Sequence, residues 1–135
     1  MKSPLLLAAL IPAVFAFTAG AETLSVEAAD QDVSGGEVSA SAIHAAVDGW
    51  LVVHRTGADH KPGPVVGHAP LKAGANMDVT AKLDEDVKSG EMLMLMLHSE
   101  EGGMKPGVFE YTLGAKEDGP VKVDGKLVMA VITAE

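Results

Sequence analysis

The stretch Asp48-Gly49-Trp50-Leu51-Val52-Val53-His54 carries the strongest structural signal in this chain of 135 residues. Asp-Gly is a dipeptide typical of tight turns, and the residues after it alternate as a β-strand requires. In an extended segment, Trp50, Val52 and His54 point to one side of the sheet, while the leucine and the valine between them point to the other. The stretch therefore predicts a β-strand that is entered from a tight turn.

The same pattern recurs along most of the chain. Further stretches alternate in the same way, and Gly, Pro, Asp and Ser gather between them as they do in turns. Short strands at this spacing are typical of an antiparallel sandwich. We therefore predict an all-β fold, an antiparallel β-sandwich of the immunoglobulin or cupredoxin kind with about seven or eight strands. The expected strands are residues 23–28, 37–44, 50–54, 64–71, 77–83, 91–98, 108–113 and 127–133.

The first 21 residues have the three parts of an export signal. Lys2 gives a positive start, residues 5–17 form an almost uninterrupted apolar run, and Ala19-Gly20-Ala21 supplies the small residues of a cleavage site. The apolar run is shorter than the about 20 residues that a membrane-spanning helix needs. We expect a signal peptide over 1–21 and a single domain over 22–135. The mature protein is then periplasmic or extracellular, without insertion into a membrane.

The domain that remains after cleavage is acidic and contains no cysteine. The whole chain has a formal net charge of −9, and the loss of Lys2 with the signal changes this to −10. An acidic surface argues against nucleic acid or anionic lipid as a partner, because both bind basic surfaces. The lack of cysteine excludes thiol catalysis, thiolate zinc sites and the blue-copper ligand set. It also means that an exported domain has to be stable without disulfides.

Three histidines at or near strand ends are the first candidate metal ligands. His54 ends one predicted strand and His68 lies in the next, and a hairpin symmetric about residue 61 places the two directly opposite each other. Directly opposed side chains are close enough to share an ion, and neutral imidazole is a common ligand for zinc and copper. His98 joins them if its strand lies beside the hairpin. The alternative is that His54 and His68 form a structural pair that hydrogen-bonds to the loop backbone.

A methionine stripe precedes His98. Met92, Met94 and Met96 alternate with leucines, so that three thioethers and the imidazole share one face of a strand. Thioether sulfur is a soft ligand that selects Cu(I), which makes Met94 and Met96 further candidate ligands. Methionine also fills irregular space in cores, and a strand that is apolar on both faces is typical of a covered central strand. Copper binding and core filling are therefore both open.

Known catalytic motifs are missing from the sequence. There is no Gly-x-Ser-x-Gly nucleophile turn, no phosphate-binding glycine loop and no His-Glu-x-x-His zinc helix. Acidic residues cluster in the predicted turns, but without the spacing of a twelve-residue calcium loop. We expect a protein that is not an enzyme and has no catalytic residues.

Five short motifs follow one another in the sequence. They are DGWLVVH at 48–54, PGPVVGH at 62–68, LMLH at 95–98, GVFEY at 107–111 and DGPV at 118–121. Together they resemble a secreted domain family of unknown function that is found in haloarchaea and bacteria. The resemblance implies an extracytoplasmic β-sandwich, often attached to larger surface proteins, and it implies no activity. It singles out His54, His68 and His98 as motif positions.

Two functions are consistent with these patterns. The first is an exported non-catalytic module that acts as a binding or structural accessory protein, with another exported protein as its expected partner. The second is a periplasmic protein that binds copper or zinc. The candidate ligands in that case are His54, His68, His98, Met94 and Met96.

Overall fold

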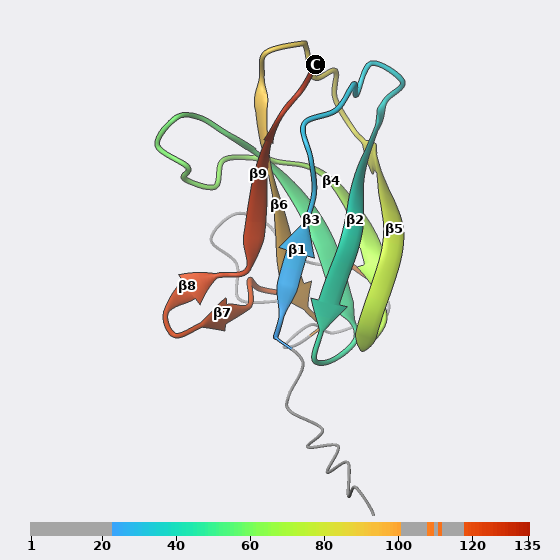
Figure 1. The fold of residues 1–135 in the computed structure, drawn as a ribbon, viewed down its shortest axis with the longest axis vertical. Coiled ribbons are helices and arrows are strands. Elements are labelled where there is room, and N and C mark those ends of the chain that lie inside the picture. Colours follow the sequence, from blue (N-terminus) through green and yellow to red (C-terminus); the bar gives the residue numbers. More distant parts are fainter. Residues whose placement is uncertain (1–22, 101–107, 110, 112–117) are drawn as a thin grey trace, which may run out of the picture.

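A computed structural model of the chain describes residues 23–100, 108–109, 111 and 118–135. Within these ranges the protein is all-β and has no helix, which confirms the predicted fold class. A seven-stranded antiparallel sheet has the order β1-β2-β5-β4-β3-β6-β9, and β7 and β8 form a separate hairpin (Figure 1). The strands are β1 (Ser25–Glu27), β2 (Glu37–Ala45), β3 (Gly49–Thr56), β4 (Val65–Leu71), β5 (Gly74–Leu83), β6 (Met92–Ser99), β7 (Lys122–Val123), β8 (Lys126–Leu127) and β9 (Met129–Thr133).

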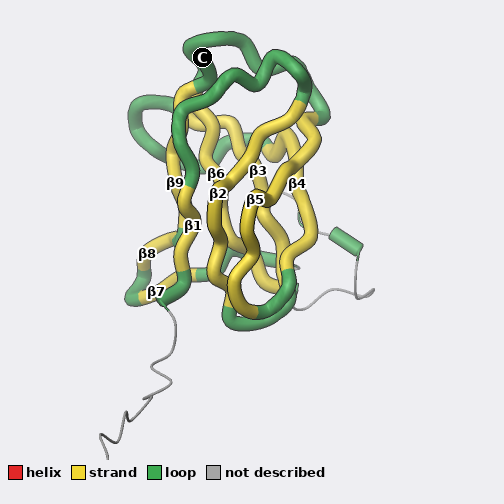
Figure 2. Tube along the Cα trace, turned by 45° about the vertical axis from the view of Figure 1, so that its right-hand side comes forward, coloured by secondary structure: helices red, strands yellow, loops and turns green. Residues whose placement is uncertain are grey.

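The large sheet curls until its two outer strands meet, which gives a sandwich that is nearly closed into a barrel (Figure 2). β1 and β9 contact each other, and a parallel bridge joins Gln31 to Ala134 just beyond them. At the opposite corner, β4 and β5 pair at two consecutive positions, Gly67 with Leu83 and His68 with Lys82. The strands therefore fall into two facing layers, β1-β2-β5 and β4-β3-β6-β9, which join at this corner.

The core lies between the two layers and is filled largely from the leucine side of β6. Leu93, Leu95 and Leu97 are almost fully buried there, and Leu51 and Val53 of β3 belong to the same cluster. Since alternate residues of a strand point to opposite faces, the pattern seen in the sequence selects these side chains. The facing layer contributes aliphatic side chains, chiefly from β2.

The opposite face of β3 and β6 is buried as well. It carries Val52, Met94 and Met96, each with almost no exposed surface. The rings of Phe109 and Tyr111 pack against histidines on this face. Burial on both faces is typical of a central strand, and β6 is such a strand.

One predicted strand is wrong where it can be compared with the structure. Of residues 108–113, Val108, Phe109 and Tyr111 are described, and none of the three lies in a strand. The remaining residues of that stretch lie outside the described ranges. The aromatic rings of Phe109 and Tyr111 contact histidines on the outer face of the sheet. Side chains can make such contacts without their backbone being paired in a strand.

The last predicted strand is divided into two elements. β8 ends at Leu127 and β9 begins at Met129, and β8 pairs with β7, which the sequence patterns did not predict. The turn between β7 and β8 has Asp124 and Gly125 in the left-handed backbone region, with φ of 52° and 77°. Positive φ at both central residues is the requirement of the hairpin turn in which Asp-Gly is favoured.

The hairpin of β3 and β4 has a different register from the predicted one. His54 pairs with Val65, whereas Val52 pairs with His68, because the pairing shifts at an irregularity after Val53. The prediction that His54 lies directly opposite His68 is therefore wrong. That prediction assumed an unbroken ladder, and a bulge places one extra residue in one of the two strands.

Gly49 lies where β3 begins beside the end of β6, and a side chain has no room there. A Cβ at this position meets the backbone carbonyl group of His98 in the neighbouring strand. We expect Gly49→Ala to lower the free energy of unfolding by about 1–3 kcal/mol, because overpacking forces the backbone to move. Gly57→Ala is the matched control, since a Cβ there meets only the Asp59 side chain, at 3.7 Å. Urea unfolding compares the two, and equal stabilities would contradict the expectation.

The described domain begins and ends at opposite ends of the sandwich. β1 and β9 run in the same direction, so the chain enters at the lower end of Figure 1 and the C-terminus lies at the upper end. None of the described segments is a helix of the length and apolar character that would cross a membrane.

Candidate functional site

The outer face of β3 and β6 holds two imidazoles and two thioethers in neighbouring rows. Each row is a cross-strand pair, in which the side chains of directly opposed residues lie close together. In order along the strands, the pairs are Trp50 with His98, Val52 with Met96, and His54 with Met94. The outer-face cluster, as we name it, consists of Trp50, His54, His68, Met94, Met96, His98, Phe109 and Tyr111.

Backbone carbonyl groups hold the imidazoles of His54 and His98. Nδ1 of His54 lies 2.8 Å from the carbonyl oxygen of Gly63, and Nδ1 of His98 lies 2.6 Å from that of Asp118. A carbonyl oxygen only accepts hydrogen bonds, so Nδ1 carries the proton in each ring and donates it. The lone pair of each neutral ring is then on Nε2.

Both Nε2 atoms are buried and have no hydrogen-bond partner within the part of the chain that the structure describes. Neither His54 nor His98 has exposed surface. An unpaired buried acceptor costs about 1–3 kcal/mol, and the large majority of buried polar groups in proteins are paired. Two such atoms in adjacent rings are therefore a feature that packing alone does not explain.

Burial keeps both imidazoles neutral. Desolvation lowers the pKa of His98 to about 4, against the hydrogen bond to Asp118, and repulsion by His54 lowers it further. Desolvation also lowers the pKa of His54, against the hydrogen bond to Gly63. Neutral imidazole is the form that binds metal ions, so both rings are in their ligand form at neutral pH.

The rings of His54 and His98 lean toward each other. The two residues are four positions apart along the paired strands, which is about 13 Å of backbone, yet their ring centres are 5.6 Å apart. Both rings therefore extend over the middle row, which is the pair of Val52 and Met96. The ring of Tyr111 packs edge-on against both, with its centre 4.4 Å from that of His98 and 6.1 Å from that of His54.

His68 stands apart from this pair. It lies on β4 opposite Val52, it is exposed, and its ring stacks on Phe109 at 4.4 Å and contacts Trp50 at 5.6 Å. Among the described residues, no three His, Asp or Glu side chains form a group able to hold a metal ion. The structure therefore brings together two of the three predicted histidines, and the ligand role of each remains a prediction.

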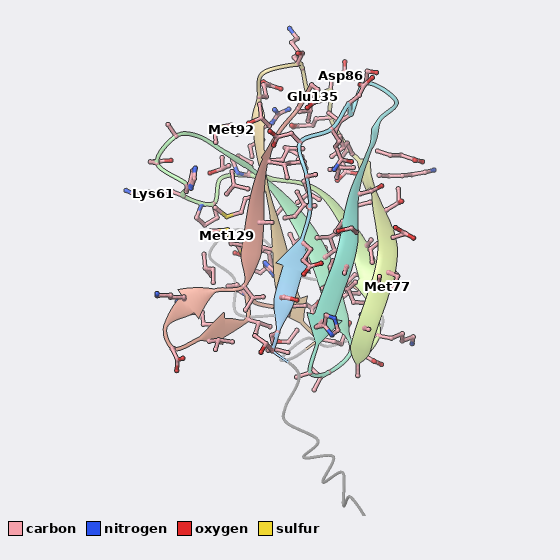
Figure 3. The ribbon with its side chains drawn as sticks, viewed as in Figure 1. Lys61, Met77, Asp86, Met92, Met129 and Glu135 are labelled. Carbon is pink, nitrogen blue, oxygen red and sulfur yellow. The ribbon has the colours of Figure 1, made fainter. Side chains whose placement is uncertain are left out.

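The methionine face is wider than the sequence patterns indicated. Met94 and Met96 are buried, and Met129 of β9 pairs with Met96 from the other side. Met129 and Met92 lie toward opposite ends of the β6–β9 pair (Figure 3). The sequence patterns missed Met129 because its position beside β6 depends on the strand order of the sheet, for which a single sequence holds no signal.

Acidic residues of the predicted turns have structural partners. Asp32 accepts a hydrogen bond from the backbone N–H of Ser34. Hydrogen bonding to the Ser34 side chain, and then this backbone bond, lower the pKa of the Asp32 carboxyl. Glu85 and Glu91 form ion pairs with Arg55. These contacts favour a structural role for the acids over a calcium site.

Comparison with known proteins identifies the family of the chain. Residues 24–135 match the model of a domain of unknown function, DUF7282. The chain belongs to this family. The match extends over all nine described strands and over every residue of the outer-face cluster. The expected membership of a domain family of unknown function is confirmed, while the individual motifs that carry it remain a prediction.

The DUF7282 chain is also similar to cell surface glycoprotein 2 of Haloarcula hispanica. The two are 30% identical over 109 residues, which is 80% of this chain and 11% of the glycoprotein. The chain thus spans about a tenth of the length of this haloarchaeal relative. No solved structure matches the DUF7282 chain.

Proposed function

We propose that this DUF7282 chain is an exported, non-catalytic module that acts by binding at the cell envelope. The observation that carries the proposal is the similarity to cell surface glycoprotein 2, where the matching region is a small part of a long protein. A unit with its own hydrophobic core that also forms part of a larger protein is typical of an independent domain. The apolar leader and the Ala19-Gly20-Ala21 sequence support export.

The state of the two buried histidines supports binding over catalysis. A general base has to come within hydrogen-bond distance of a proton on its substrate. His54 and His98 have no exposed surface, and their Nδ1 atoms already donate to backbone carbonyl groups. Burial and these hydrogen bonds fix both imidazoles in place, which suits binding and does not suit proton transfer to a substrate.

The charge of the domain supports two kinds of partner. A net charge of −10 after cleavage attracts cations and the basic surfaces of other proteins. The partner of the module is therefore another exported protein with a basic surface, or a metal ion.

Export is tested by expressing the full chain in a Gram-negative host and measuring the intact mass of the protein in the periplasmic fraction. We expect the mass of residues 22–135, because cleavage follows Ala21. The variant with Ala19→Phe and Ala21→Phe lacks the small residues that the peptidase recognises, and we expect it to keep residues 1–21. The variant with serine at both positions is the matched control and is cleaved. A wild-type chain that stays in the cytoplasm uncleaved overturns the proposal.

A further inference from the structure

We propose that the outer-face cluster is a binding site for one soft monovalent metal ion, Cu(I), with Nε2 of His54, Nε2 of His98 and the thioether of Met96 as ligands. This inference rests on the proposed function and names the ligand of the module. Four observations support it, and they concern the nitrogen donors, the distance between them, the sulfur donor, and the charge and burial of the cluster.

The nitrogen donors are in the state that a metal site requires. Metal-binding histidines generally donate the proton of their other ring nitrogen to a backbone carbonyl group or a carboxylate, which fixes the tautomer and the ring orientation. His54 and His98 both do so, through Gly63 and Asp118. The remaining lone pairs are on the two buried Nε2 atoms without a partner among the described residues. A bound cation would satisfy both of these lone pairs.

The separation of the rings suits a shared ion. An ion about 2.0 Å from an imidazole nitrogen lies about 3.1 Å from the ring centre. Two imidazoles on one ion therefore have ring centres about 5 Å apart at the tetrahedral angle and about 6 Å apart in a linear arrangement. The centres of His54 and His98 are 5.6 Å apart, between these limits, as in a three-coordinate site.

The position of Met96 makes it the third ligand. The histidines come from the two outer rows and extend over the middle row. In that row Val52 has no donor atom, and Met96 is the buried residue that carries one. Met96 is almost fully buried, so its sulfur is not directed to solvent. Met94 borders the site beside His54, and Met129 borders it beside Met96.

Charge and burial select the metal. The proposed ligands are two neutral imidazoles and a neutral thioether, and all three residues have almost no exposed surface. The cost of moving an ion out of water is high and rises steeply with its charge, so a buried set of neutral ligands favours a monovalent ion over Zn²⁺ or Cu²⁺. Thioether sulfur likewise selects Cu(I). The ring of Tyr111 covers the two imidazoles and helps to exclude water.

The test uses the exported protein purified from the periplasm, with Ag(I) as a redox-inert, diamagnetic probe and Cu(I) under anaerobic conditions. Each metal is titrated in competition with a chromophoric chelator, and the ring nitrogens of all histidines are followed by ¹⁵N NMR. We expect one equivalent to bind and to shift the Nε2 resonances of His54 and His98, while those of exposed His60 stay in place.

Variants separate the ligands from the architecture. His54→Asn and His98→Asn keep a side-chain N–H near the position of Nδ1 but remove the Nε2 lone pair, and we expect each to weaken binding about 100-fold or more. Met96→Leu conserves volume and should weaken binding about 10-fold or more. Met77→Leu is the matched control, because Met77 is 66% exposed on β5 (Figure 3) and pairs with Ala42 of β2 in the other layer. It should bind as the wild type does.

The proposal is overturned if wild-type protein binds neither Ag(I) nor Cu(I), or if the Nε2 resonances do not move. It is also overturned if Zn(II) binds more tightly than both, or if Met96→Leu and Met77→Leu behave alike. The wild-type titration decides the question even if a histidine variant does not fold. Failure here leaves the mass and location of the exported chain unchanged, so it is distinct from failure of the proposed function.

Discussion

The metal-free domain is expected to lose about 3 kcal/mol of stability through His98 alone as the pH falls from about 6.5 to about 4. In the unfolded chain His98 has the ordinary histidine pKa of about 6.5, whereas burial lowers its pKa in the folded protein to about 4. Between these values the unfolded state binds a proton that the folded state does not, so acid favours unfolding. The difference amounts to about 1.4 kcal/mol per pH unit. Above pH 6.5 and below pH 4 the contribution is constant.

His54 acts in the same direction, since its pKa is also lowered. Among the described residues, the ionisable rings in contact with His98 are those of His54 and Tyr111, and the carbonyl group of buried Asp118 is its hydrogen-bond partner. Urea unfolding at a series of pH values, with a chelator present, measures the effect.

The control for this pH effect is a variant that does not titrate. His98→Asn retains a donor for the Asp118 carbonyl group and should have a shallower dependence of stability on pH than the wild type. His60→Asn changes an exposed turn residue and should keep the wild-type dependence. The carboxyl groups titrate in all three proteins, so the difference between the curves isolates His98. Parallel curves for wild type and His98→Asn would show that His98 does not stay neutral in the folded state.

Leu95→Ala is expected to cost about 3–5 kcal/mol of unfolding free energy. Leu95 lies in the middle of β6, has no exposed surface and belongs to the core cluster between the two layers. Its neighbours across the sheet are Val53 and Ala130, and the paired backbone on both sides prevents the site from collapsing. Removal of the side chain therefore leaves a cavity in addition to the lost burial. For a domain of this size the midpoint of thermal unfolding should fall by about 15 °C.

Met77→Ala is the matched control for Leu95→Ala. It also truncates an apolar side chain in a strand, but Met77 is 66% exposed. Substitutions at such surface positions usually change stability by about 0.5 kcal/mol or less. If both variants unfold at the same temperature, the leucine side of β6 does not form the core of the domain.

The general fold was predictable from the sequence because strands have a period of two. Alternation around Trp50 and around Met94 assigns β3 and β6, and Gly, Pro and Asp at fixed points separate the strands. The register of the hairpin was not predictable, because the irregularity after Val53 breaks the symmetric pairing of β3 with β4 and no local pattern marks it. The strand order depends on how the sheet curls, and no local pattern encodes it.

The site was predictable in part for the same reason. His54, His98 and the methionines share an outward direction that parity alone assigns. Their proximity depends on β3 and β6 being neighbours and on the lean of both rings over the middle row. Tyr111 escaped prediction as a member of the site, because its aromatic stretch resembles a strand in sequence. The carbonyl partners of the two Nδ1 atoms lie in segments between strands. Sequence patterns predict such segments but not the direction of each carbonyl group.

The entry and exit of the chain at opposite ends of the sandwich set how this unit adds to a longer protein. A domain whose two termini lie side by side adds little length to the chain in which it is inserted. Here the polypeptide enters at one end of the sandwich and leaves at the other (Figure 1). A strand of nine residues such as β2 is about 30 Å long. A surface protein that incorporates the fold in line extends by that distance with each copy.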